Sequence, residues 1–129
     1  MPGPSAEPGG AHKGNGATLI CTKDPQGYTI SLDVHRWQDH IIKRHPEMRE
    51  RLERVKLTIE DPQVIAVSAT SATAYYYRLA GRATRSVDDL YLLVVVERNE
   101  QFKTGAVKPA HLLKNLKTNQ SRIVWLKKI

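Results

Sequence analysis

The chain of 129 residues contains a single cysteine, Cys21, so no disulfide can form within it. Cys21 has no CxxC partner and does not stand at a strand-to-helix elbow, which argues against nucleophilic cysteine chemistry. The lack of disulfides favours a reducing compartment. We therefore expect a cytoplasmic protein, or one that is delivered into the cytoplasm of a target cell.

Long apolar runs are absent as well. No stretch approaches the roughly 18 consecutive apolar residues of a transmembrane helix, so we expect no membrane partner. Residues 1–17 are rich in glycine and proline and lack the apolar centre of a signal peptide, and we interpret them as a disordered arm. Residues 18–129 are enough for one domain with its own core.

Acidic residues are missing from the last part of the chain, because none follows Glu100. Seven basic residues do follow it: Lys103, Lys108, Lys114, Lys117, Arg122, Lys127 and Lys128. These seven positive charges equal the net charge of +7 of the whole chain, so the basic and acidic residues up to Glu100 are equal in number. A one-sided basic surface suggests a polyanionic partner such as RNA, DNA or an acidic protein. A solubilising tail is the alternative.

The first half of the chain predicts a hairpin followed by two helices. Residues 17–21 and 28–33 are β-prone runs on either side of a turn that contains proline and glycine. Asp33 is suited to cap a helix over residues 34–45, and Pro46 is suited to open the next helix. The second helix has its apolar residues at spacings of four, three and four: Met48, Leu52, Val55 and Ile59.

The second half predicts strands. The β-prone runs are residues 64–67, 74–79, 90–96 and 101–107, followed by a short helix over 109–116 and a last strand over 122–126. The run 90–96 does not alternate, which indicates a central strand covered on both faces. Helices first and strands afterwards give an α+β domain, with an N-terminal hairpin and two helices packed on an antiparallel sheet of about four strands.

Residues 34–48 concentrate the side chains that could do chemistry. Three basic residues stand among the histidines of this stretch: Arg36, Lys43 and Arg44. At about 100° per residue, four apolar residues fall in one sector of the helix: Val34, Trp37, Ile41 and Ile42. His40 lies at the edge of this sector, and His45 projects near its middle, just before a proline that disfavours continued helix.

The text Trp37-x-x-His-Ile-x-x-Arg-His-Pro-Glu-Met48 resembles the small nucleases of the barnase/EndoU/colicin/RelE-like (BECR) superfamily, especially its phage-borne members. The likeness extends over roughly residues 28–125, through a tyrosine-rich strand, a valine-rich strand and Lys103-Thr104. It implies helices followed by a four-stranded antiparallel sheet. It also implies metal-independent RNA cleavage, in which the 2′-hydroxyl attacks the adjacent phosphate and leaves a 2′,3′-cyclic phosphate.

The resemblance implies catalytic residues on the first helix and a late strand, here His40, Arg44, His45 and Thr104. An imidazole at His40 can serve as general base or acid, and an ordinary interfacial histidine is the alternative. Arg44 can clamp a phosphate, or it can pair with a nearby glutamate, Glu47 or Glu50. His45 can reach substrate only if the backbone before the proline turns it outward; otherwise it is a hydrogen-bonded core residue.

Further residues are expected to bind nucleic acid: Arg36, Lys43, Arg78, Lys103, Lys108 and His111. Lys103 and Thr104 would lie on opposite faces of one strand, so Lys103 would contribute general attraction. Tyr75 and Tyr77 share one strand face, while Tyr76 and Arg78 share the other. Either pair can stack a base or simply cover the sheet.

No metal site or cofactor is expected. Histidines at intervals of five rotate successive ligands by about 140°, whereas a zinc pair on a helix requires spacing near i, i+4. The chain also lacks a glycine-rich phosphate loop. The leading hypothesis is therefore an endoribonuclease, such as a phage or interbacterial toxin, for which the resemblance implies an acidic immunity or antitoxin protein as partner. A non-catalytic nucleic-acid-binding module is the main alternative, and a protein–protein adaptor is the third.

Overall fold

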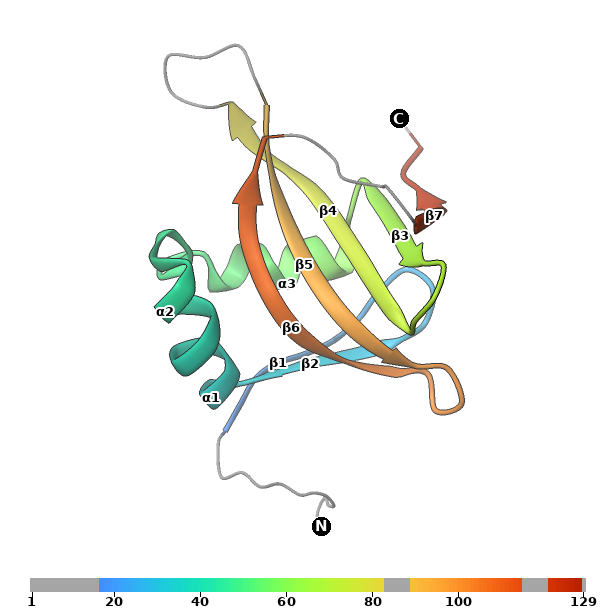
Figure 1. Cartoon of the computed structure of the whole chain (residues 1–129), viewed down its shortest axis with the longest axis horizontal. Helices are drawn as coiled ribbons and strands as arrows, with labels where there is room; N and C mark the ends of the chain where they lie inside the picture. The colour runs from blue at the N-terminus through green and yellow to red at the C-terminus, as the bar shows by residue number, and fades with distance from the viewer. Residues whose placement is uncertain (1–16, 83–88, 115–120, 129) are drawn as a thin grey trace.

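The computed structural model of the chain describes residues 17–82, 89–114 and 121–128. Most of the expected arm, residues 1–16, lies outside this part, and so do residues 115–116 of the predicted short helix. The described strands form one mixed sheet in the order β1-β2-β6-β5-β4-β3-β7 (Figure 1). They are β1 (Thr18–Lys23), β2 (Thr29–Asp33), β3 (Val64–Ser68), β4 (Thr73–Arg82), β5 (Asp89–Asn99), β6 (Thr104–Leu113) and β7 (Ser121–Leu126).

The predicted α+β arrangement, with two helices on an antiparallel sheet of about four strands, is wrong, because the described part is mostly a seven-stranded mixed sheet. The hairpin β1–β2 is part of this sheet, since Thr29, Ile30 and Ser31 pair in parallel with β6. At the opposite edge, β7 pairs antiparallel with β3. A parallel pair between strands so far apart in the chain leaves no local signal in the sequence.

The short helix predicted over residues 109–116 is also wrong, because β6 continues through Pro109. The register between β5 and β6 shifts there, from Val96 opposite Val107 to Val94 opposite Ala110. Pro109 therefore lies in a β-bulge, one of the few places in a sheet that tolerate a residue without an N–H.

The first helical segment is divided into α1 (Val34–Arg36), a π-helical turn η1 (Trp37–Ile41) and α2 (Ile42–Arg44). The Asp33 carboxylate accepts a hydrogen bond of 2.7 Å from the backbone N–H of Arg36, which confirms the predicted cap. The segment ends at His45, whose φ of −134° and ψ of 75° are not helical, as the proline that follows requires. The π-helical turn carries His40, and such turns are frequent at functional sites.

A 3-10 turn, η2 (Pro46–Met48), leads to the longer helix α3 (Leu52–Glu60). The helix predicted to open at Pro46 therefore begins only at Leu52, after residues 49–51, which are not helical. Within α3, Val55 and Ile59 are fully buried, as the apolar spacing predicts, while Met48 is buried from the 3-10 turn before it. Figure 1 shows α3 behind the sheet and the first helical segment beside β6. The two helices therefore cover one face and one side of the sheet.

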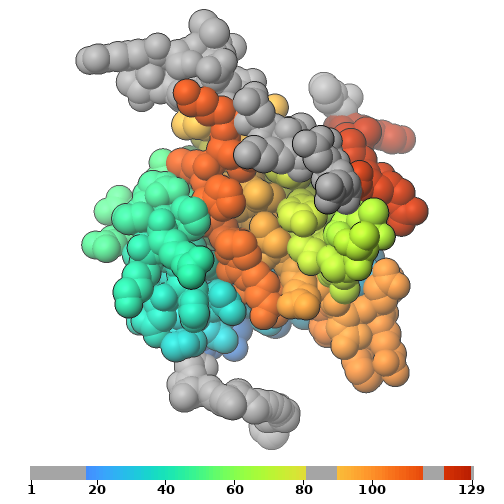
Figure 2. Space-filling model, viewed as in Figure 1, coloured from blue at the N-terminus to red at the C-terminus, as the bar shows by residue number. Residues whose placement is uncertain are grey.

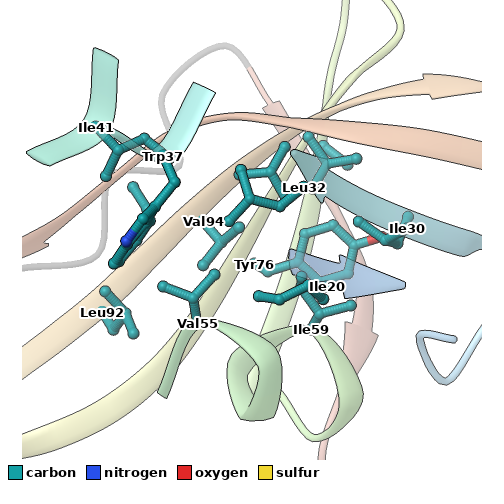
Figure 3. Close-up of a cluster of buried hydrophobic side chains, with 14 of the residues drawn as sticks. Ile20, Ile30, Leu32, Trp37, Ile41, Val55, Ile59, Tyr76, Leu92 and Val94 are labelled. Atoms are coloured by element: carbon teal, nitrogen blue, oxygen red, sulfur yellow. The ribbon is translucent and has the colours of Figure 1, made fainter. Parts of the chain in front are cut away.

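The main core lies between the sheet and the helices (Figure 3). Trp37 and Ile41 of the first segment join Val55 and Ile59 of α3 there, and Tyr76 of β4 is fully buried with them. Each large apolar side chain that is fully buried contributes about 1.5–3 kcal/mol. A second, smaller cluster on the other face contains Val64, Tyr77 and Leu93. The prediction that β5 is buried on both faces holds around Leu93, which belongs to the second cluster, whereas Glu97 and Asn99 further along that face are exposed.

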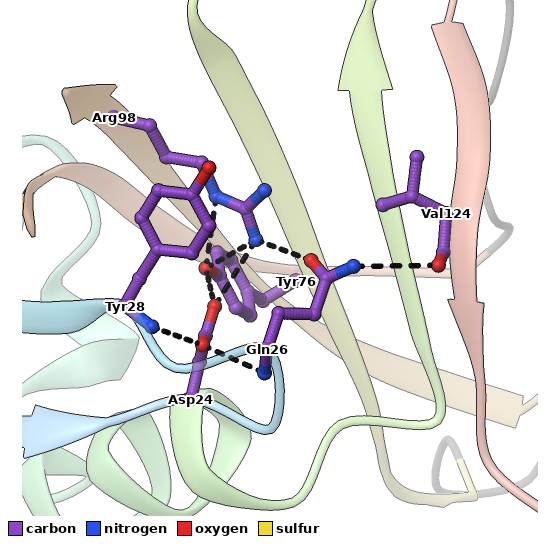
Figure 4. Close-up of polar contacts among 6 residues, drawn as sticks. All are labelled: Asp24, Gln26, Tyr28, Tyr76, Arg98 and Val124. Carbon is purple, nitrogen blue, oxygen red and sulfur yellow. Dashed lines mark hydrogen bonds and ion pairs between the residues drawn. The ribbon is translucent and has the colours of Figure 1, made fainter. Parts of the chain in front are cut away.

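A buried polar network fixes the turn between β1 and β2 (Figure 4). The Asp24 carboxylate accepts hydrogen bonds from the backbone N–H of Tyr28 at 2.8 Å, from the Tyr76 hydroxyl at 2.5 Å and from Arg98 at 3.0 Å. The Arg98 guanidinium also lies 4.0 Å from the centre of the Tyr28 ring. Burial and the hydrogen bond to Asp24 raise the pKa of Tyr76. The network joins the hairpin to β4 and β5.

Candidate functional site

Two histidines that are distant in the sequence lie against each other beside β6. His45 follows the first helical segment, and His111 lies on β6. Their ring centroids are 4.7 Å apart and their planes are inclined by 22°, so the rings are stacked. The contact arises because β2 pairs with β6 only as far as Ala106, and the helical segment lies beside the rest of β6 (Figure 1).

The stacked pair lies on the face of the sheet away from α3. His111 stands opposite Leu93 of β5, which belongs to the second cluster, whereas its neighbours Leu92 and Val94 belong to the main core. Figure 2 shows this face, with β6 visible between the helical segment and β5. We refer to it as the open face.

His45 remains accessible. Its side chain is 32% exposed, and Nδ1 lies 3.7 Å from a carboxylate oxygen of Glu47. A carboxylate beside Nδ1 favours a ring orientation in which Nε2 is turned away from it. His45 is therefore not a buried core residue, which was the alternative that the sequence left open.

His40 lies in a separate group on the outer side of the helical segment. Its ring meets the ring of His35 edge to face, with centroids 5.3 Å apart, and His35 Nδ1 lies 2.7 Å from an Asp39 oxygen. Desolvation lowers the pKa of His40, and the positive charges of Arg36 and Arg44 lower it further, while Asp39 acts in the opposite direction. His40 is half-buried and mainly neutral at pH 7, so it can accept a proton.

The basic side chains of this segment remain available. Arg44 and Lys43 are exposed, and Arg36 is half-buried. Within the described ranges, none of the three forms an ion pair. The alternative in which Arg44 is neutralised by Glu47 or Glu50 is therefore not realised.

The structure does not bring Thr104 to the histidines. Thr104 is exposed at the first position of β6, and His111 lies seven residues further along, about 23 Å away for an extended strand. Lys103 precedes the strand with a positive φ of 56°, and its ammonium group lies 4.6 Å from the centre of the Tyr28 ring. Neither the Lys103 nor the Thr104 side chain therefore lies beside the stacked histidines.

Arg78 lies away from the open face. Its guanidinium donates to the backbone oxygen and carboxylate of Asp61 at 2.8 and 3.1 Å. The division of the tyrosines between the two faces is confirmed, since Tyr77 belongs to the second cluster and Tyr76 to the main core. Both are fully buried, which leaves half-buried Tyr75 as the accessible ring of the three.

A hollow of about 560 Å³ lies on the open face, where β1, β2, β6 and β5 run side by side. Its lining contains mostly small or polar residues: Cys21, Thr29, Ser31, Glu97, Arg98, Asn99, Thr104, Gly105, Ala106 and Lys108. Lys108 lies 3.8 Å from Glu97 across its floor. Lys108 and His111 are three positions apart on β6, so the bulge at Pro109 leaves at most about 10 Å of strand between them.

No group of three or more potential metal ligands occurs in the part of the chain that the structure describes. Among those same residues, no helix is long and apolar enough to cross a membrane.

The importance of His111 is not evident from the sequence. The interpretation of residues 109–116 as a helix separates His111 from the sheet and treats it as one more residue of a basic tail. The one available signal is the register of β6: with a bulge at Pro109, His111 falls on the face opposite Ala110. Tertiary packing alone determines that the His111 ring lies against the ring of His45.

No protein-family model matches the chain, and no curated protein and no solved structure matches it either. The resemblance to the BECR nucleases therefore depends on the quoted motifs. The function has to be argued from the geometry of the described residues.

Proposed function

We propose that the chain is a metal-independent endoribonuclease that cleaves RNA by attack of a 2′-hydroxyl on the adjacent phosphate. The observation that carries this proposal is the stacking of His45 on His111 at the accessible side of β6. The motif around the first helix, which resembles BECR nucleases, points to the same reaction.

The reaction requires two proton transfers. One group takes the proton of the 2′-hydroxyl, and another gives a proton to the 5′-oxygen that leaves. Imidazoles titrate near neutral pH and can do both, so two of them within reach of one phosphate form an acid–base pair. In this proposal His45 and His111 have these two roles. The Glu47 carboxylate lies 3.7 Å from Nδ1 of His45, so in this proposal Nε2 is the nitrogen that faces the substrate.

Negative charge on the phosphate oxygens increases during the attack and must be offset. Arg44 is exposed, without an ion pair among the described residues, and close enough to His40 to lower its pKa. A guanidinium can bind two phosphate oxygens at once. Arg44 is assigned this role, with Arg36 and Lys43 adding attraction for the RNA backbone. His40, held mainly neutral, is a further proton acceptor.

The direct test is incubation of the protein with total cellular RNA in the presence of a chelator, followed by mapping of product ends. The proposal predicts fragments with 2′,3′-cyclic phosphate and 5′-hydroxyl ends. Intact RNA at high protein concentration would refute it. Binding of RNA without cleavage would instead indicate the non-catalytic nucleic-acid-binding module.

A toxic ribonuclease requires an inhibitor, and an acidic immunity or antitoxin protein is the partner that this proposal implies. Arg44 and Lys43 are exposed, directly precede His45 in the chain and form no ion pair among the described residues, so they offer such a protein a basic surface. An inhibitor bound there would prevent access of RNA. Charge reversal of Lys43 to Glu should then weaken inhibitor binding, as measured by calorimetry.

A further inference from the structure

We infer that the hollow on the open face is a subsite for single-stranded RNA, holding nucleotides that flank the cleaved phosphate. This inference rests on the proposed ribonuclease function and extends it to the path of the substrate. The hollow begins at Lys108, at most about 10 Å along β6 from His111. A strand bound at the histidines can therefore continue into it.

The floor of the hollow is built from two rows of residues that cross the sheet. In one row Cys21 stands opposite Ser31, Ser31 opposite Ala106, and Ala106 opposite Glu97. The next row on the same face runs from Lys23 through Thr29 and Thr104 to Asn99. Residues between these rows point into the core, as fully buried Ile30 shows. Small side chains in both rows leave the space that the hollow occupies.

The chemistry of the floor suits ribose and phosphate better than an apolar ligand. Three hydroxyls line it, from Thr29, Ser31 and Thr104, and the Asn99 amide adds a further donor, since its oxygen already accepts the backbone N–H of Phe102 at 3.2 Å. Such groups form the sugar and phosphate contacts that position a nucleic acid, and 2′-hydroxyls distinguish RNA from DNA. Thr104, remote from the histidines, acquires a role in this way as a binding residue.

The charged residues of the lining are paired in the free protein, so attraction for an anionic strand depends on Lys108 and on the neighbouring Lys23. Lys108 lines the hollow, and Lys23 stands at the end of one row. Arg98 is occupied by the buried Asp24, so it contributes no free cation. Glu97 is the acidic residue of the lining, and Lys108 lies 3.8 Å from it. Bound phosphate would draw Lys108 away from Glu97.

Cys21 supplies a direct probe because it is the only cysteine, is exposed and lines the hollow. The experiment uses the full chain carrying His45→Ala, so that RNA is bound without being cut. The rate of Cys21 alkylation by a maleimide is measured for the protein alone, for the protein with an unstructured oligoribonucleotide of eight nucleotides, and for the protein with a dinucleotide. Saturation of the protein by each oligonucleotide is established separately, by fluorescence anisotropy and by competition.

The inference predicts that the saturating octanucleotide slows alkylation at least several-fold, while the dinucleotide changes it little because it cannot reach from His111 to Cys21. An unchanged rate at saturation would overturn the inference. The matching DNA octanucleotide should bind more weakly and protect less. Equal protection by DNA would contradict recognition of the 2′-hydroxyls.

A pair of charge variants gives a second measurement. Ser31→Asp places a carboxylate in the middle of the hollow, and we expect octanucleotide affinity to fall about tenfold. Thr70→Asp adds the same charge at the exposed turn between β3 and β4 and should leave affinity unchanged. Equal effects of both variants would overturn the inference. Protection of Cys21 by RNA that the unmodified chain fails to cleave would refute the proposed function alone, whereas cleavage without protection would refute the subsite alone.

Discussion

Arg98 on β5 lies 3.0 Å from the carboxylate of Asp24 in the β1–β2 turn, and both side chains are almost wholly buried. The pair holds the hairpin against the centre of the sheet. The floor of the hollow depends on this arrangement, because its rows continue from the hairpin onto β6 and β5.

Removing one member of this pair should destabilise the fold strongly. Arg98→Met leaves the Asp24 carboxylate buried and uncompensated, and we expect the free energy of unfolding to fall by about 3–5 kcal/mol. Urea denaturation followed by circular dichroism measures this. Lys56→Met, which removes the exposed partner of Glu60 on α3, is the control and should cost less than about 1 kcal/mol. Equal effects would contradict the structural role of the buried pair.

Gly105 tests the parallel pairing of β2 with β6. A Cβ at this position would lie 2.6 Å from Val96 Cγ1 and 2.8 Å from Ile30 Cδ1, so both side chains would have to move. Gly105→Ala should therefore reduce the free energy of unfolding by about 1–3 kcal/mol. Ala106→Ser, at an exposed position of the same strand, should change it little. A neutral Gly105→Ala variant would show that β2 and β6 are not packed in this register.

The stacked histidines should be required for cleavage. His45→Ala and His111→Ala should each reduce kcat by about 10²–10⁴-fold, the range typical of general acid–base catalysis, with RNA affinity nearly retained. Because they act as a pair, the double variant should lose much less than the product of the two single effects. Steady-state cleavage of a fluorogenic oligonucleotide measures this. His35→Ala removes an exposed imidazole outside the pair, and it should retain most of the activity.

The pKa of His40 should respond to its charged neighbours in a defined order. Arg36→Ala removes the strongest repelling charge and should raise this pKa, and Arg44→Ala should raise it by less. Asp39→Asn should lower it, because an attracting charge is lost. Titration of the His40 ring by NMR measures all three variants. Arg49→Ala, an exposed change further along the chain, is the control, and a shift of equal size in that variant would refute the arrangement.

If His40 takes part in proton transfer, the same variants should move the pH dependence of cleavage. Raising the pKa of a general base moves the acidic limb of the rate profile to higher pH, so Arg36→Ala should lose activity first on the acidic side. A profile that stays fixed while the NMR titration moves would assign the proton transfers to His45 and His111 alone.

The sequence itself determined the local features of this protein. Asp33 caps the helix because its carboxylate reaches the N–H of Arg36, and the helix ends at His45 because Pro46 disfavours helical backbone before it. The apolar spacing of α3 and the continuous apolar run of β5 likewise record which faces are buried. These signals extend over a few residues, so they can be interpreted without knowing the fold.

The tertiary structure decided what lies beyond that range. The parallel pairing of β2 with β6, and the continuation of β6 through the bulge at Pro109, depend on partners from distant parts of the chain. Only this pairing places His111 against His45 and separates Thr104 from both. Strand register is set by long-range packing rather than by local propensity, so the sequence presents the imidazoles but does not determine which of them meet.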